Sequence, residues 1–174
     1  MSESNEISTR LPIYPIAGEF QAKTGEKLNL CDFVRRVLEP FAEQISAQSI
    51  SLCIDVPANL QFAMDGPLFK QALKCLCEEA VRNMPDGGEL VITAVEQDQG
   101  IELEVADSRS DHLKSPRPFG GIGGRRDQTF PDNLHPVYQF AALHEGFVRE
   151  QNCPEGGVAF TIHLPLNKAM RSAA

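Results

Sequence analysis

The chain has 174 residues, enough for one domain with a hydrophobic core, and its 42% hydrophobic and 23% charged residues exclude wholesale disorder. Acidic residues outnumber basic ones by 24 to 16, and the net charge of −8 disfavours nucleic acids and anionic membranes as partners, because both carry phosphates. No apolar run approaches the roughly 20 residues that span a bilayer, and the polar start differs from a secretory signal. Five cysteines without paired spacing indicate reduced, mostly buried thiols, so we expect a cytoplasmic protein.

The first part of the chain contains one strong helix signal. Residues 1–25 lack clear periodicity and predict a tail or linker, with a short strand around Leu11 to Ile16. Apolar residues then recur at three- and four-residue spacing from Leu30 to Ile45, which is the pattern of a helix with one buried face. Pro40 lies inside this pattern and predicts a kink.

A strand and a second helix follow. Apolar and polar residues alternate from Ser49 to Val56, which predicts a half-buried strand, and a short extended piece covers Gln61 to Met64. Pro67 follows Asp65 and Gly66 and is suited to the first turn of a helix, which we expect to end near Asn83. Its predicted core stripe consists of Phe69, Ala72, Leu73, Leu76 and Ala80.

The remaining elements predict an α+β fold. Two strands, at 89–96 and 101–106, are joined by a tight turn and predict a hairpin. A long polar segment, 108–131, precedes a third helix at 133–144, and the last two strands are expected at 147–151 and 158–166. This order predicts a two-layer α/β sandwich, with three main helices on one face of a mixed, mostly antiparallel sheet. We expect residues 26–168 to form the domain, with tails at 1–25 and 169–174.

The second helix and the turn after it resemble a known nucleotide-binding motif. From Leu73 to Ile92 the chain reads LKCLCEEAVRNMPDGGELVI. This stretch and the order of elements resemble the histidine-kinase-like ATPase family, which includes the ATP-binding domain of sensor histidine kinases and the anti-sigma-factor serine kinases. In that family the helix carries two Asn four apart, then Ala, then Lys or Arg, before a Gly-Gly turn. Four residues fit this pattern, namely Ala80, Arg82, Gly87 and Gly88, whereas Cys75 and Glu79 occupy the two Asn positions.

The other nucleotide motifs are only partly present. The family's Asp-x-Gly-x-Gly motif corresponds to Asp107 through Asp111, where Asp107 fits and Arg109 and Asp111 replace the glycines. The glycines that the family has before the last helix are absent at their expected positions. An earlier run, containing Gly120, Gly121, Gly123 and Gly124, resembles a displaced version of that loop. The final stretch, Gly156 to Pro165, resembles the family's last strand.

The resemblance implies roles for these residues in binding Mg²⁺ and ATP. Glu79 would offer oxygen to Mg²⁺, Arg82 would meet phosphate, and Asp107 would accept a hydrogen bond from the adenine amino group. The glycines of 120–124 would cradle phosphate. Other interpretations stay open, because Glu79 also suits a solvated helix face, Asp107 a strand end, and the glycine run a loop without ligand.

Two functions are compatible with this pattern. The first is a regulatory or partner-docking module of two-component-type signalling with a degenerate nucleotide pocket, and the missing glycines favour it. The alternative is an active Mg-ATP-dependent protein kinase, of the histidine-kinase or anti-sigma serine-kinase type, that phosphorylates a partner in trans. The catalytic residue is unknown in either case. The expected partner is a response regulator, a kinase or a sigma-factor antagonist, and a homodimer or a structural subunit without ligand also stays open.

Overall fold

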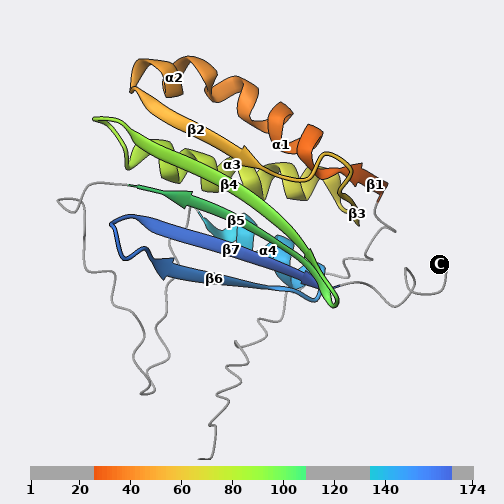
Figure 1. Ribbon diagram of the computed structural model, residues 1–174. Helices are drawn as coiled ribbons and strands as arrows, with labels where there is room; N and C mark the ends of the chain where they lie inside the picture. Colours follow the sequence, from red (N-terminus) through yellow and green to blue (C-terminus); the bar gives the residue numbers. More distant parts are fainter. Residues whose placement is uncertain (1–25, 109–133, 166–174) are drawn as a thin grey trace, which may run out of the picture.

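The computed structural model describes residues 26–108 and 134–165, so the predicted strand at 11–16 and the glycines of 120–124 lie outside the described residues. The helices and strands, in chain order, are β1 (Glu26–Asn29), α1 (Leu30–Leu38), the 3-10 helix η1 (Glu39–Phe41), α2 (Ala42–Ala47), β2 (Ile50–Asp55), β3 (Gln61–Met64), α3 (Gly66–Arg82), β4 (Gly88–Gln97), β5 (Gly100–Asp107), α4 (His135–Leu143), β6 (Phe147–Asn152) and β7 (Val158–Pro165) (Figure 1).

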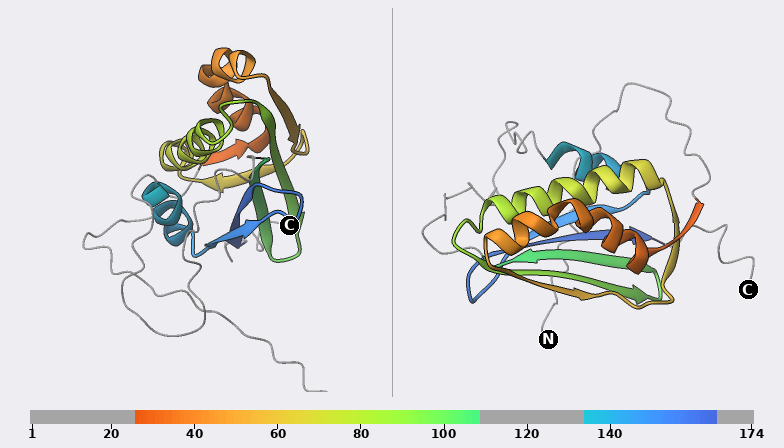
Figure 2. Two further views of the ribbon diagram at one scale, coloured as in Figure 1. Left: turned by 90° about the vertical axis from the view of Figure 1, so that its left-hand side faces the viewer. Right: turned by 90° about the horizontal axis from the view of Figure 1, so that it is seen from above.

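Five strands form one mixed sheet in the order β2-β4-β5-β7-β6. The β4–β5, β5–β7 and β7–β6 pairs are antiparallel, whereas β2 runs parallel to β4. A parallel neighbour requires a long crossover connection, and here the chain passes through β3 and α3 between β2 and β4. The helices cover one face of this sheet, and no helix among the described residues covers the other face (Figure 2). The predicted two-layer sandwich is therefore confirmed.

The core lies between the two layers and is organised around α3. All five residues of the predicted stripe on this helix are buried. Three phenylalanine rings connect the helices, because Phe69 of α3 lies between Phe33 of α1 and Phe140 of α4, at centroid distances of 5.0 and 5.1 Å. Aromatic pairs at this spacing add to the stability that burial gives. The ring series fixes how α1 and α4 sit on either side of α3.

The first predicted helix is interrupted where the sequence predicts a kink. After α1, the chain forms η1 around Pro40 and then resumes as α2. Proline has no amide hydrogen to continue the helical ladder, so a tighter turn takes its place. At the start of α1, the Asn29 side chain accepts a hydrogen bond from the Asp32 amide at 2.9 Å and caps the helix.

Two features of the N-terminal half differ from the expectation. The strand β1 was not predicted, and it pairs antiparallel with β3 as a separate two-stranded sheet. The strand β2 is less buried than its alternation suggests, because Leu52 is 39% exposed although it points to the helix side of the sheet. None of the helices in the described ranges has both the length and the apolar composition of a membrane span.

Candidate nucleotide site

Two predicted site residues are the buried charged side chains of the described part of the chain. Glu79 is 4% exposed and Asp107 is 5% exposed, and burial of an ionisable group is costly unless the fold satisfies it. Glu79 lies in the last turns of α3, and Asp107 is the last residue of β5. The C-terminal end of α3 leads into the start of β4, where Leu90 pairs with Asp107, so both carboxylates belong to the same end of the domain (Figure 1).

The Glu79 carboxylate is held by side chains of its own helix end. Its Oε2 atom lies 3.1 Å from Nη1 of Arg82, in an ion pair, and its Oε1 atom accepts a hydrogen bond from Nδ2 of Asn83 at 2.9 Å. The same Asn83 amide group also donates to the backbone oxygen of Glu79 at 2.7 Å. Three- and four-residue spacing places these side chains on one face of the helix end, so the buried carboxylate has an ion-pair partner and a hydrogen-bond donor beside it.

Asp107 is positioned by the sheet. It shares the helix-facing side of β5 with Ile101, Leu103 and Val105, because residues two apart point to the same face. The following residue, Ser108, accepts a hydrogen bond from the Glu89 amide at 2.7 Å through its hydroxyl and donates its own amide to the Glu89 carbonyl at 3.0 Å. The strand end is thereby fixed one residue beyond Asp107.

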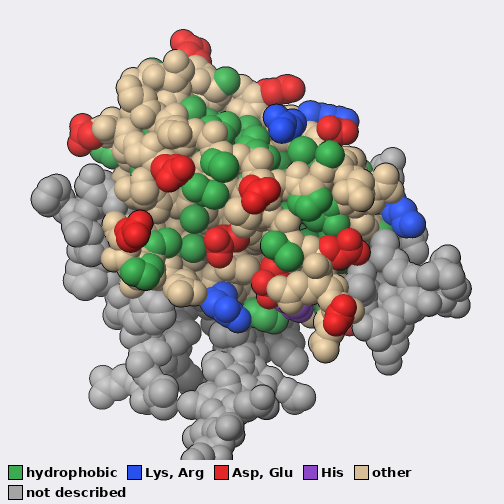
Figure 3. Space-filling model, viewed as in Figure 1, with side chains coloured by type: hydrophobic (Ala, Val, Ile, Leu, Met, Phe, Trp, Pro, Cys, Tyr) green, Lys and Arg blue, Asp and Glu red, His purple; other side chains and the backbone are tan. Residues whose placement is uncertain are grey.

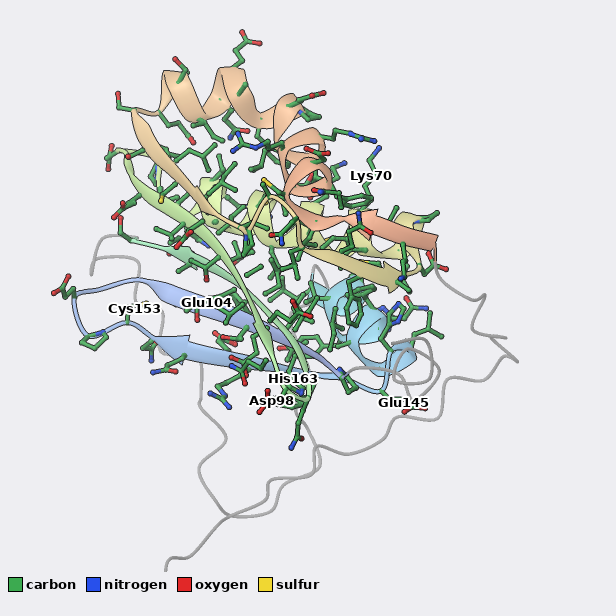
Figure 4. All side chains as sticks on the ribbon, turned by 45° about the vertical axis from the view of Figure 1, so that its right-hand side comes forward. Lys70, Asp98, Glu104, Glu145, Cys153 and His163 are labelled. Carbon is green, nitrogen blue, oxygen red and sulfur yellow. The ribbon has the colours of Figure 1, made fainter. Side chains whose placement is uncertain are left out.

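The turn between β6 and β7 also lies at this strand end. Gly157 has a φ of +94°, and a Cβ atom at this position would collide with the carbonyl oxygen of Asp107. Cys153 lies in the same turn (Figure 4), and burial, followed by the negative charges of Glu104 and Asp107, raises the pKa of its thiol. The Glu104 and Asp107 carboxylates therefore both act on this turn, which packs closely against the end of β5.

The Glu79 carboxylate, to which the resemblance assigns a magnesium ion, is already engaged by two neighbouring side chains. Mg²⁺ requires oxygen ligands in near-ideal octahedral geometry. Both Glu79 oxygens already have donors, and a cation placed there would meet the Arg82 guanidinium; two unit charges 4 Å apart repel by about 4 kcal/mol at an effective dielectric of 20. Asp107, to which the family resemblance assigns the adenine contact, is buried at the end of β5.

The structure brings together some of the predicted site residues and adds one. Glu79 and Arg82 are in direct contact, Asp107 lies at the same end of the domain, and Cys75, on the same helix, is half-buried with a pKa raised mainly by burial. The sequence analysis missed Asn83, although its four-residue spacing from Glu79 is the signal that could have identified it. The glycines of 120–124 lie outside the described residues.

The curated proteins that are similar to this chain include two histidine kinases. The sensor histidine kinase TmoS of Ectopseudomonas mendocina is 22% identical over 179 residues, which cover 96% of this chain and 18% of that protein. The signal transduction histidine-protein kinase BaeS of Escherichia coli is 26% identical over 139 residues, which cover 75% of this chain and 30% of that protein. The chain thus spans less than a third of the length of these relatives. No protein-family model matches it.

Solved structures show which fold this is. The catalytic domain of histidine kinase ThkA superposes with a TM-score of 0.66 and 21% identity, covering 82% of this chain and 97% of that one. The mycobacterial sensor histidine kinase MprB gives a TM-score of 0.62 at 22% identity, covering 81% and 97%. ThkA in complex with the response regulator TrrA gives 0.63 at 23% identity, covering 82% and 42%. The chain is therefore a domain with the histidine-kinase-like ATPase fold, the fold of the catalytic domain of sensor histidine kinases.

Proposed function

We propose that this chain is a regulatory or partner-docking module of two-component-type signalling, built on the histidine-kinase-like ATPase fold, with a degenerate nucleotide pocket. The burial of the Glu79 carboxylate and its contacts with neighbouring side chains are the observation that carries the proposal. The resemblance puts a magnesium-holding Asn at this position, and here a buried carboxylate is instead paired with Arg82 and hydrogen-bonded by Asn83. A site that satisfies its own charge has little to offer a metal-bound triphosphate.

The proposed partner is a response regulator. The relatives TmoS and BaeS are named as sensor or signal-transduction histidine kinases, and the similar ThkA has been crystallised with a response regulator. The net charge of −8 is consistent with a protein partner rather than a nucleic acid.

The alternative, an active Mg-ATP-dependent kinase acting in trans, is favoured by Asp107. Its carboxylate is buried at the end of β5, where the family resemblance places the adenine-reading residue, and burial strengthens a hydrogen bond to a ligand. In that case Asp107→Asn weakens nucleotide binding by about 1–3 kcal/mol, because a charged hydrogen bond is lost.

Titration of a fluorescent ATP analogue, with and without Mg²⁺, tests the proposal. We expect no affinity tighter than about 100 μM, which corresponds to roughly 5.5 kcal/mol, and no strengthening by Mg²⁺. Glu79→Asn removes the buried charge and restores the amide of the family, so Mg²⁺-dependent binding is expected to increase in this variant. The matched control is Glu78→Asn, because Glu78 is the exposed neighbour on the same helix. Tight, Mg²⁺-dependent binding to the unmodified chain that ADP competes away contradicts a degenerate pocket.

A further inference from the structure

Within the described residues, the strand β2 forms an edge of the sheet, beside α1 and α2, whose own sequence carries none of the usual features that block pairing. It lies at the end of the strand order and has β4 as its neighbour (Figure 1). Edge strands usually carry lysine, proline or a bulge that prevents another strand from adding. The β2 sequence, ISLCID, contains neither residue, its register with β4 is continuous, and its one charge, Asp55, is the last residue. The opposite edge strand, β6, carries Arg149 and Glu150.

An open apolar groove runs beside this edge. It has a volume of about 500 Å³ and lies between β2 and the helices α1 and α2, where Figure 3 shows hydrophobic side chains at the surface. Leu52, which is 39% exposed, forms part of its floor. Contact between a leucine side chain and water is unfavourable, so covering Leu52 would be stabilising. The groove is lined by Arg35, Leu38, Glu39, Ala42, Ile45, Ser46, Ile50, Leu52 and Ile54.

The charges in the groove are one of each sign. Arg35 and Glu39 both line it, and among the described residues the structure gives neither of them an ion pair. A surface with one cation and one anion can face a rotated copy of itself with opposite charges in contact. This charge pattern therefore fits a second copy of the chain better than it fits a partner whose surface charges are all of one sign.

The sequence of β2 is also self-complementary. When two such strands run antiparallel with Leu52 at the centre, Ile50 of one copy lies opposite Ile54 of the other, and Ser51 lies opposite Cys53. Directly opposite residues in an antiparallel pair point to the same face of the sheet. The apolar pairs then face the helix side, together with both grooves, and the small polar pairs face the open side.

We propose that two copies of this chain associate through their β2 edges, in an antiparallel register centred on Leu52, so that one sheet continues across both copies. A two-fold interface uses the same patch on each subunit, which is what the groove and the strand both provide. The pairing satisfies the outward backbone groups of β2 and removes Leu52 from water. This proposal goes beyond the function proposed above and does not depend on nucleotide binding.

Light scattering on the full chain after size-exclusion chromatography tests the proposal. We expect the mass of a dimer, and we expect Leu52→Lys to halve that mass while the circular dichroism spectrum stays unchanged. Val95→Lys is the matched control, because Val95 is 53% exposed on the open face of β4, and it is expected to leave the dimer intact. A monomeric unmodified chain, or a dimer that Leu52→Lys does not change, overturns the proposal; in the monomeric case the β2 edge is left for a strand of another protein.

A disulfide experiment tests the register without weakening the edge. In a Cys53→Ser background, Leu52→Cys places two thiols opposite each other at the two-fold axis, where the Cα separation of about 4.5–5.5 Å suits a disulfide. Mild oxidation is expected to give a covalent dimer of this variant and none of the control, Val95→Cys in the same background. No covalent dimer from Leu52→Cys, or equal amounts from both variants, overturns the proposed register.

Discussion

Asn83 has a larger role at the residue scale than its position after the last turn of α3 suggests. Its side-chain amide donates two hydrogen bonds, to the carboxylate and to the backbone oxygen of Glu79. Arg82, the other partner of this carboxylate, is 60% exposed, so solvent screens its attraction to Glu79. Asn83, which is half-buried, is therefore expected to contribute more than Arg82 to satisfying the Glu79 carboxylate.

We expect Asn83→Ala to destabilise the fold by about 1–3 kcal/mol, because it leaves a buried carboxylate without one of its donors. Urea unfolding followed by circular dichroism measures this change. Lys74→Ala is the control, because it removes an exposed ion pair with Glu78, and such pairs contribute about 0–1 kcal/mol. Equal losses in the two variants contradict this role of Asn83.

The sequence predicted which residues to examine but not how buried each side chain is. The motif spacing identified Glu79, Arg82 and Asp107, and two of these are the buried charges of the described residues. The burial of Glu79 could not be predicted from helical spacing. On the same stripe of the helix, Cys75 is half-buried and Arg82 is exposed. Burial depends on which elements pack above the helix, which is a tertiary property.

At the element scale, His144 connects the end of α4 to the start of α3. The Asp65 amide donates a hydrogen bond to Nε2 of His144 at 3.3 Å, and the imidazole packs on the Phe140 ring at a centroid distance of 4.7 Å. Burial lowers the pKa of His144 from its usual value of 6.5, and the charge of Asp65 opposes part of this shift. The bond requires a neutral imidazole, since a protonated one cannot accept.

Stability is therefore expected to depend on the charge of His144. Because its pKa is lower in the folded state, the unfolded chain binds more protons below about pH 6.5, and the contribution of His144 decreases as the pH falls from there. Replacing His144 by Gln is expected to reduce the difference in unfolding free energy between about pH 7.5 and pH 5.5. Replacing the exposed His135 by Gln is the control, and a slope that changes equally in both variants contradicts the prediction.

The elements that the sequence predicted well are those with local signals. The stripe of α3 and the β4–β5 hairpin depend on residues close in the chain, and their bounds agree closely with the prediction. The four residues of β1 show no alternation, and their pairing with β3 is long-range, so nothing local indicated a strand. The alternation of apolar and polar residues also could not reveal that β2 is an edge strand. Its single neighbour in the sheet, β4, comes after α3 in the chain, so this pairing is long-range.

At the scale of the whole molecule, the five cysteines are free and differ in exposure. Cys31 and Cys77 are buried, but Cys53 is exposed and Cys75 and Cys153 are half-buried, so the expectation of mostly buried thiols was wrong. Burial, reinforced by the charge of Glu78, raises the pKa of Cys77 to about 12. A thiol in this state has almost no reactive thiolate near neutral pH.

We expect an aromatic disulfide reagent to modify Cys53 rapidly in dilute native protein and Cys77 only when the chain unfolds. Absorbance at mildly alkaline pH follows the release of the coloured thiolate. Cys53→Ser is expected to abolish the fastest phase, and Cys77→Ser to change only the amplitude seen after denaturant is added. Survival of the fastest phase in Cys53→Ser contradicts the exposure pattern.

The contact between Gly157 and the carbonyl of Asp107 limits which sequences can build this strand end. Any side chain at position 157 would occupy the space of that oxygen, and a φ of +94° already disfavours residues other than glycine. Natural variants that keep the backbone here are consequently confined to one amino acid at this position, however far their helix motif has diverged. Distant relatives that keep this strand end are therefore expected to keep this glycine, even where their nucleotide motifs have changed.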